Sequence, residues 1–111
     1  MTGFIAGFVT RPAAVAMLPI IGAVWGGPAL AADAAKGGLL AQRWCAACHV
    51  VSASQTQGGT QAPAFSTIAK TRGLDAAAIA LFLLAPHPTM PDMSLSRAEA
   101  ADLAAYIHSQ K

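Results

Sequence analysis

The chain has 111 residues, which is enough for one domain. Apolar residue types make up 55% of it and charged residues only 11%, and the formal net charge is +2. Residues 32–111 hold six of the seven Lys and Arg residues and all five Asp and Glu residues, so this part is nearly neutral. The even balance argues against nucleic-acid binding, which needs a basic stripe.

Residues 1–31 have the pattern of a secretory signal peptide. Arg11 ends a weakly positive start, an uncharged apolar run follows it, and Ala29 and Ala31 offer the small residues that signal peptidase accepts. We expect cleavage after Ala31, or otherwise after Ala32, and export to the periplasm. The alternative is an uncleaved membrane anchor, because about 20 apolar residues can span a bilayer. A proline, a glycine pair and the small-residue site argue against an anchor.

Residues 32–111 form the expected folded domain, and its first helix should run from residue 34 to about 48. Asp33 is suited to cap the start of this helix. Gly37 and Gly38 lie inside it, where each glycine costs about 1 kcal/mol relative to alanine. A close approach of another helix at this point would compensate for that cost.

The two cysteines of the chain, Cys45 and Cys48, stand three residues apart, and His49 follows directly. This Cys-Ala-Ala-Cys-His string is the attachment motif of c-type haem. Two thiols on one turn can add to the two vinyl groups of a porphyrin, and the following imidazole then lies beneath the ring and binds its iron. We therefore expect one covalently attached haem c.

Three other interpretations of the cysteine pair are open. A thioredoxin-like redox pair would need a βαβ pattern, which the sequence lacks. Half of a zinc site would have only His87 and His108 as further nitrogen donors. A structural disulfide between cysteines three apart would close too small a loop to stabilise the fold much.

Two shorter helices are predicted in the middle of the domain. Residues 52–60 are polar and aperiodic and indicate a surface loop. Residues 65–71 could form a short helix with Phe65 and Ile68 turned inward. Asp75 then caps a third helix that stops at Ala85. Because this helix is apolar nearly all round, we expect it to be buried on two sides, by haem and by protein.

The proline-rich stretch from 85 to 94 holds Met90 and Met93, the candidates for a second axial iron ligand. A thioether ligand favours reduced iron and so suits an electron carrier. Met90 is the preferred ligand because Pro91 stiffens the chain beside it, and Met93 is the alternative. His87 could give bis-histidine ligation, although two flanking prolines constrain its approach.

A capping box of Ser96 and Glu99 predicts the start of the last helix. Apolar residues then recur at helical spacing as far as Ile107, and we expect His108 to face solvent. No alternating strand pattern occurs, so the predicted fold is all-α, with about four short helices around one haem.

The domain resembles the class I monohaem cytochromes c, in particular the small periplasmic ones of bacteria. The resemblance covers residues 33 to about 110 and rests on four motifs. These are the Cys-Ala-Ala-Cys-His string, Ala-Pro-Ala-Phe at 62–65, Met-Pro at 90–91 and Leu-Ala-Ala-Tyr-Ile at 103–107.

The resemblance implies a role for several positions. Gly37 would lie where the first and last helices cross, against Leu103 and Tyr106. The carbonyl of Pro63 would accept a hydrogen bond from Nδ1 of the haem histidine, and Met90 would be the distal ligand.

The resemblance also implies a one-electron carrier rather than an enzyme. As a monomer, it would dock weakly with redox-protein donors and acceptors at the haem edge, around Ala46, Ala47, Pro88 and Pro91. Two alternatives stay open. The chain could be a dedicated haem subunit of a periplasmic dehydrogenase or other oxidoreductase. If Met90 does not bind, it could instead be a five-coordinate gas sensor or peroxidase.

Overall fold

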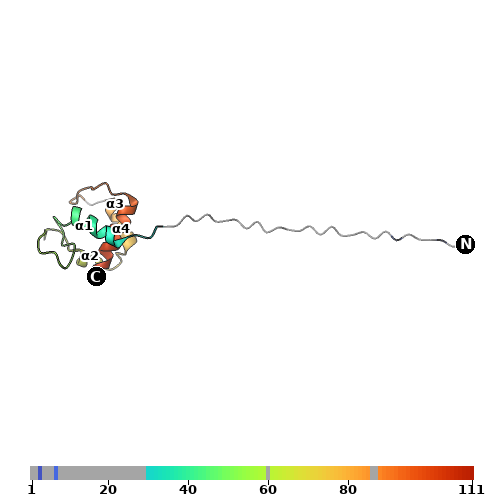
Figure 1. The fold of residues 1–111 in the computed structure, drawn as a ribbon, viewed down its shortest axis with the longest axis horizontal. Helices are drawn as coiled ribbons and strands as arrows, with labels where there is room; N and C mark the ends of the chain where they lie inside the picture. Colours follow the sequence, from blue (N-terminus) through green and yellow to red (C-terminus); the bar gives the residue numbers. More distant parts are fainter. Residues whose placement is uncertain (1–2, 4–6, 8–29, 60, 86–87) are drawn as a thin grey trace.

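A computed structural model describes Gly3, Gly7 and residues 30–59, 61–85 and 88–111. It contains four helices, α1 (Ala34–Trp44), α2 (Phe65–Ala69), α3 (Ala76–Leu84) and α4 (Arg97–Ser109), shown in Figure 1. The described residues contain no strand, which confirms the predicted all-α class. No helix within them is both long and apolar enough to cross a membrane. Most of the proposed signal peptide lies outside the described residues, so its cleavage stays a prediction.

Helix α1 begins as predicted but ends earlier. The Asp33 carboxylate accepts hydrogen bonds from the backbone N–H groups of Ala35 and Lys36 at 3.0 and 3.1 Å. The predicted continuation to about Cys48 is wrong, because the chain turns more tightly after Trp44. The haem-attachment motif therefore lies on turns that follow the helix.

Helix α4 starts at the predicted capping box. The Ser96 N–H donates to Glu99 Oε2 at 2.8 Å, and the Glu99 N–H donates to Ser96 Oγ at 3.2 Å. The face that α4 buries consists of Ala100, Leu103, Ala104 and Ile107.

Helices α1 and α4 cross at close range. A Cβ atom at Gly37 would collide with the backbone of Asp102, and one at Gly38 would lie 3.0 Å from the Tyr106 ring. Two hydrogen bonds tie α4 to the segments around α1. Asp33 N–H donates to Asp102 Oδ1 at 2.6 Å, and Tyr106 Oη donates to the Val51 carbonyl at 2.9 Å. The predicted reason for glycine at position 37 is confirmed.

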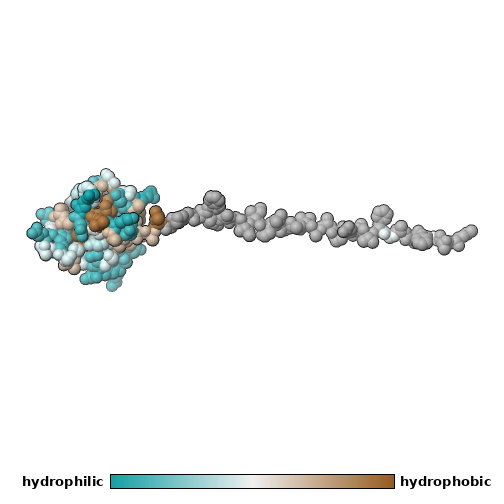
Figure 2. All heavy atoms as spheres, viewed as in Figure 1, coloured by the Kyte–Doolittle hydropathy of each residue, from teal (hydrophilic) through white to brown (hydrophobic). Residues whose placement is uncertain are grey.

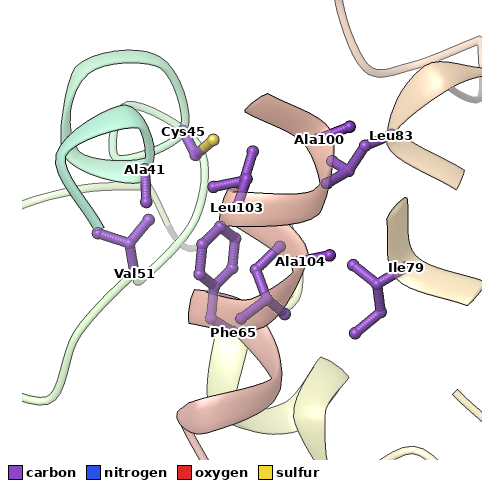
Figure 3. Close-up of a cluster of buried hydrophobic side chains, with 10 residues drawn as sticks. Ala41, Cys45, Val51, Phe65, Ile79, Leu83, Ala100, Leu103 and Ala104 are labelled. Atoms are coloured by element: carbon purple, nitrogen blue, oxygen red, sulfur yellow. The ribbon is translucent and has the colours of Figure 1, made fainter. Parts of the chain in front are cut away.

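The core is built around α4. Figure 3 shows Leu103 and Ala104 in the middle, with Ala41 and Val51 on one side and Ile79 on the other. Cys45 belongs to this buried cluster as well.

Protein packs against only one face of helix α3. Its face toward the core holds Ile79 and Leu83, whereas Leu81, Phe82 and Leu84 are 69%, 51% and 41% exposed. The expectation that protein buries one side of α3 is confirmed by Ile79 and Leu83. Phe82 lines a cavity, and burial of that side by haem stays a prediction. Figure 2 shows a group of brown, hydrophobic atoms among hydrophilic ones on the surface of the folded domain.

Candidate haem-binding site

Two adjoining cavities meet at the cysteine motif. We call the one of about 250 Å³, whose wall contains core residues, the inner cavity, and the one of about 330 Å³ the outer cavity. Cys45, His49, Pro63 and Met90 line both of them. The remaining wall of the inner cavity is apolar and is formed by Phe65, Ile68, Leu74, Ile79, Phe82, Leu83 and Ile107. The outer cavity is lined further by Trp44, Cys48, Gln61, Ala62, Thr89, Pro91 and Met93.

The two thiols lie in different surroundings on the same turn. Cys45 is only 6% exposed and belongs to the core, whereas Cys48 is exposed and lines the outer cavity. Burial raises the pKa of the Cys45 thiol to about 11, and the neighbouring Cys48 adds to the shift. The two thiols would therefore hold an attached ring from one buried and one exposed position.

The His49 ring has a defined orientation and a defined tautomer. Its Nδ1 lies 2.6 Å from the Pro63 carbonyl oxygen. Because a carbonyl can only accept, Nδ1 carries the proton and donates it, which leaves the lone pair of Nε2 available as a metal ligand. The ring also contacts Phe65, with centroids 5.4 Å apart and planes tilted by 51°.

Backbone hydrogen bonds bring Pro63 opposite His49. The Ala62 N–H donates to the Cys48 carbonyl at 3.2 Å, and the Phe65 N–H donates to the Val50 carbonyl at 3.0 Å. These two bonds align residues 62–65 with residues 48–50. Pro63 has no N–H to donate, so it contributes only its carbonyl.

The two methionines differ in what they line. Met90 is half-buried and lines both cavities, whereas Met93 lines only the outer one. His87 lies outside the described residues. His108 is half-buried, against the expectation that it faces solvent, and it lines a separate hollow beside the connection from α2 to α3.

These residues suit a haem. The cavities bring together two thiols, one imidazole whose Nε2 is available, and a thioether, within mostly apolar walls. This donor set matches covalent attachment of a porphyrin and axial ligation of its iron.

Gln55 is a contributor to the site that sequence analysis missed. Its side-chain amide hydrogen-bonds to three backbone groups around His49. In the sequence, Gln55 is only a polar residue in a predicted surface loop. The spacing between His49 and Gln55 does not indicate that this loop folds back onto the haem-attachment motif.

Comparisons with known proteins agree with this geometry. Residues 32–107 match the family model for cytochrome C oxidase, cbb3-type, subunit III. The chain is also 51% identical over 81 residues to cytochrome c-552 of Bradyrhizobium diazoefficiens, an alignment that covers 73% of this chain and 78% of the relative. The chain belongs to this family of c-type cytochromes. No solved structure matches it.

Membership of the c-type cytochromes confirms two of the predictions made from the sequence. The cofactor is covalently bound haem c with its iron. In general terms, the protein is a haem-based electron carrier.

Proposed function

We propose that this c-type cytochrome carries single electrons between a donor and an acceptor protein in the periplasm, after removal of residues 1–31. Cys45 and Cys48 form the two thioethers, and His49 and Met90 are the axial ligands. The observation that carries the proposal is the hydrogen bond from His49 Nδ1 to the Pro63 carbonyl. It leaves Nε2 available beside cavities that Met90 also lines.

Each residue has a distinct task in this proposal. The bound haem supplies an iron that takes up and releases one electron. The hydrogen bond from Nδ1 makes His49 a better donor and holds its ring plane. The thioether of Met90 favours the reduced iron and so raises the reduction potential relative to a second imidazole. Cys48 keeps one edge of the ring near the surface, where electrons can leave.

Partners would dock at this exposed edge through apolar contacts. Trp44 is 52% exposed beside the outer cavity, and Phe82 is 51% exposed beside the inner one. Ala47, Pro88 and Pro91 are exposed as well. Electron-transfer encounters use small interfaces, so a monomer that docks weakly suits this surface. We expect electron-transfer rates to depend little on ionic strength, and a steep salt dependence would contradict apolar docking.

A second candidate function is that of a haem subunit within an oxidoreductase. The description of the matched family, which names an oxidase subunit, favours this candidate. The name of the relative, cytochrome c-552, mentions no enzyme complex. Purification of the native protein distinguishes the two, because a subunit would co-purify with its enzyme and a carrier would elute alone.

Ligation is tested on protein matured in a periplasm that has haem-attachment machinery. We expect sharp c-type bands after reduction and a weak near-infrared sulfur-to-iron band in the oxidised form. Met90→Ala should abolish the near-infrared band, whereas Met93→Ala is the matched control and should keep it. Loss of the band in Met93→Ala alone would assign the ligand to Met93. Covalent haem without the band in the unmodified protein would indicate bis-histidine or open-site ligation.

A further inference from the structure

We propose that Gln55 is a positioning residue that holds the haem-ligating turn in the geometry His49 needs. The proposal rests on the function proposed above, in which His49 binds the iron. Gln55 is half-buried in the loop that follows the cysteine motif and does not line either cavity.

The first argument concerns the hydrogen-bond partners of the backbone carbonyls in the turn. The Cys45 carbonyl accepts from the N–H groups of Cys48 and His49 at 3.1 and 2.9 Å. The Ala46 and His49 carbonyls instead accept from Gln55 Nε2, at 3.3 and 3.1 Å. One side chain thus serves two carbonyls, one of which belongs to the proposed ligand residue.

The second argument is that Gln55 also accepts a hydrogen bond. The Val51 N–H donates to Gln55 Oε1 at 2.7 Å, which is the shortest of the three bonds. The amide therefore ties together residues 46, 49 and 51, on both sides of the ligand. Only a side chain with one acceptor and two donors can make all three bonds, and a carboxylate of the same shape would face two carbonyls without donors.

The third argument is the close packing of the loop against the turn. Gly58 has φ +142°, and a Cβ atom there would collide with the Gln55 amide. A Cβ atom at Gly59 would lie 2.8 Å from Cys48 Cα. The loop therefore lies directly on the turn at these two glycines, where a side chain would push it away.

Together these contacts give His49 two independent anchors. The Pro63 carbonyl holds the ring through Nδ1, and Gln55 holds the main chain through the His49 carbonyl. The ring plane over the iron depends on both anchors. Without Gln55 the ring would be held from one side only.

The experiment compares haem-loaded Gln55→Ala and Gln55→Glu with the unmodified protein. Ser96→Ala is the matched control, because it removes a helix cap of α4 and lowers stability without touching the turn. Two quantities are measured: the electron paramagnetic resonance g-values of the ferric form, which report the axial ligand planes, and the hydrogen exchange of the Val51 amide.

In Gln55→Ala we expect shifted g-values and a Val51 amide that exchanges about tenfold faster, the factor that corresponds to one lost hydrogen bond. Gln55→Glu keeps the acceptor for Val51 but loses both donors, so it should shift the g-values with a smaller change in exchange. Ser96→Ala should change neither quantity. Unchanged g-values in both Gln55 variants would overturn the proposal, even if the Val51 amide exchanged faster.

A measurement on the unmodified haem protein keeps the proposal testable if the variants do not mature. Both side-chain amide protons of Gln55 should exchange slowly and show magnetic contacts with the turn. A freely rotating Gln55 amide would overturn the proposal. If the unmodified protein itself lacks a six-coordinate low-spin spectrum, the proposed pairing of His49 with Met90 as axial ligands fails rather than the role of Gln55.

Discussion

At the scale of single residues, the crossing of α1 and α4 depends on the lack of a side chain at Gly37. At Gly37 the two backbones of α1 and α4 come so close that a Cβ atom would collide with the Asp102 carbonyl. Backbone atoms in two packed helices cannot move aside as a flexible side chain can. Glycine at position 37 therefore lowers the intrinsic stability of α1 but allows the two helices to cross closely.

This contact predicts the effect of Gly37→Ala. Helix propensity alone would favour alanine by about 1 kcal/mol. The overpacked crossing should cost about 1–3 kcal/mol and outweigh that gain. We expect a lower unfolding free energy in denaturant titrations of the haem protein. Gly38→Ala is the control and should cost less, because its Cβ would meet the side chain of Tyr106 rather than backbone. Equal stability of the Gly37→Ala variant and the unmodified protein would contradict the crossing.

At the scale of elements, helix starts and helix ends are specified differently. Asp33, Asp75 and Ser96 each accept a hydrogen bond from the backbone of the helix that they precede. These caps act within a few residues, so the sequence predicts them well. The end of α1 has no such local signal, because the carbonyls beyond Trp44 are satisfied in part by Gln55 and Ala62.

The capping box of α4 predicts a pH dependence. The pKa of the Glu99 carboxyl lies below its usual value because the Ser96 backbone N–H donates to it. A lowered folded-state pKa stabilises the protein above the unfolded pKa, and this contribution is lost as pH falls through the folded value. Glu99→Gln keeps an acceptor but cannot titrate.

We therefore expect the unmodified protein to be more stable than Glu99→Gln at neutral pH. The two should converge below the ordinary glutamate pKa of about 4.3. Thermal unfolding from pH 7 to pH 3 measures this. Part of the acid dependence should persist in the variant, because the pKa of Asp33 is also lowered by the backbone N–H of Lys36. A constant stability difference across this range would show that the Glu99 charge has no part in it.

At the scale of the whole molecule, a haem bound in the inner cavity would complete the core. The inner cavity of about 250 Å³ adjoins buried side chains of three helices. Without the haem, the apolar side chains that line this cavity would be exposed to water, which is unfavourable.

The chain without its haem should accordingly be poorly folded. The double variant Cys45→Ala, Cys48→Ala cannot attach the ring and should lose most of its helical circular dichroism relative to the haem protein. Cooperative thermal unfolding should be lost too. Native-like helix content in this variant would show that the protein part of the core is sufficient.

The sequence by itself determined the features that depend on neighbouring residues. The spacing of Cys45, Cys48 and His49 indicated the cofactor, and the caps indicated where helices begin. These features depend on groups a few residues apart, whose geometry one turn of chain sets.

Only the tertiary structure decided which distant groups meet. It ended α1 at Trp44, left one face of α3 exposed, and brought Gln55 onto the turn and the Pro63 carbonyl to His49. The physical reason is that the residues next to a loop carbonyl or amide do not specify its hydrogen-bond partner. Which groups it reaches depends on how the whole chain packs around the cavity.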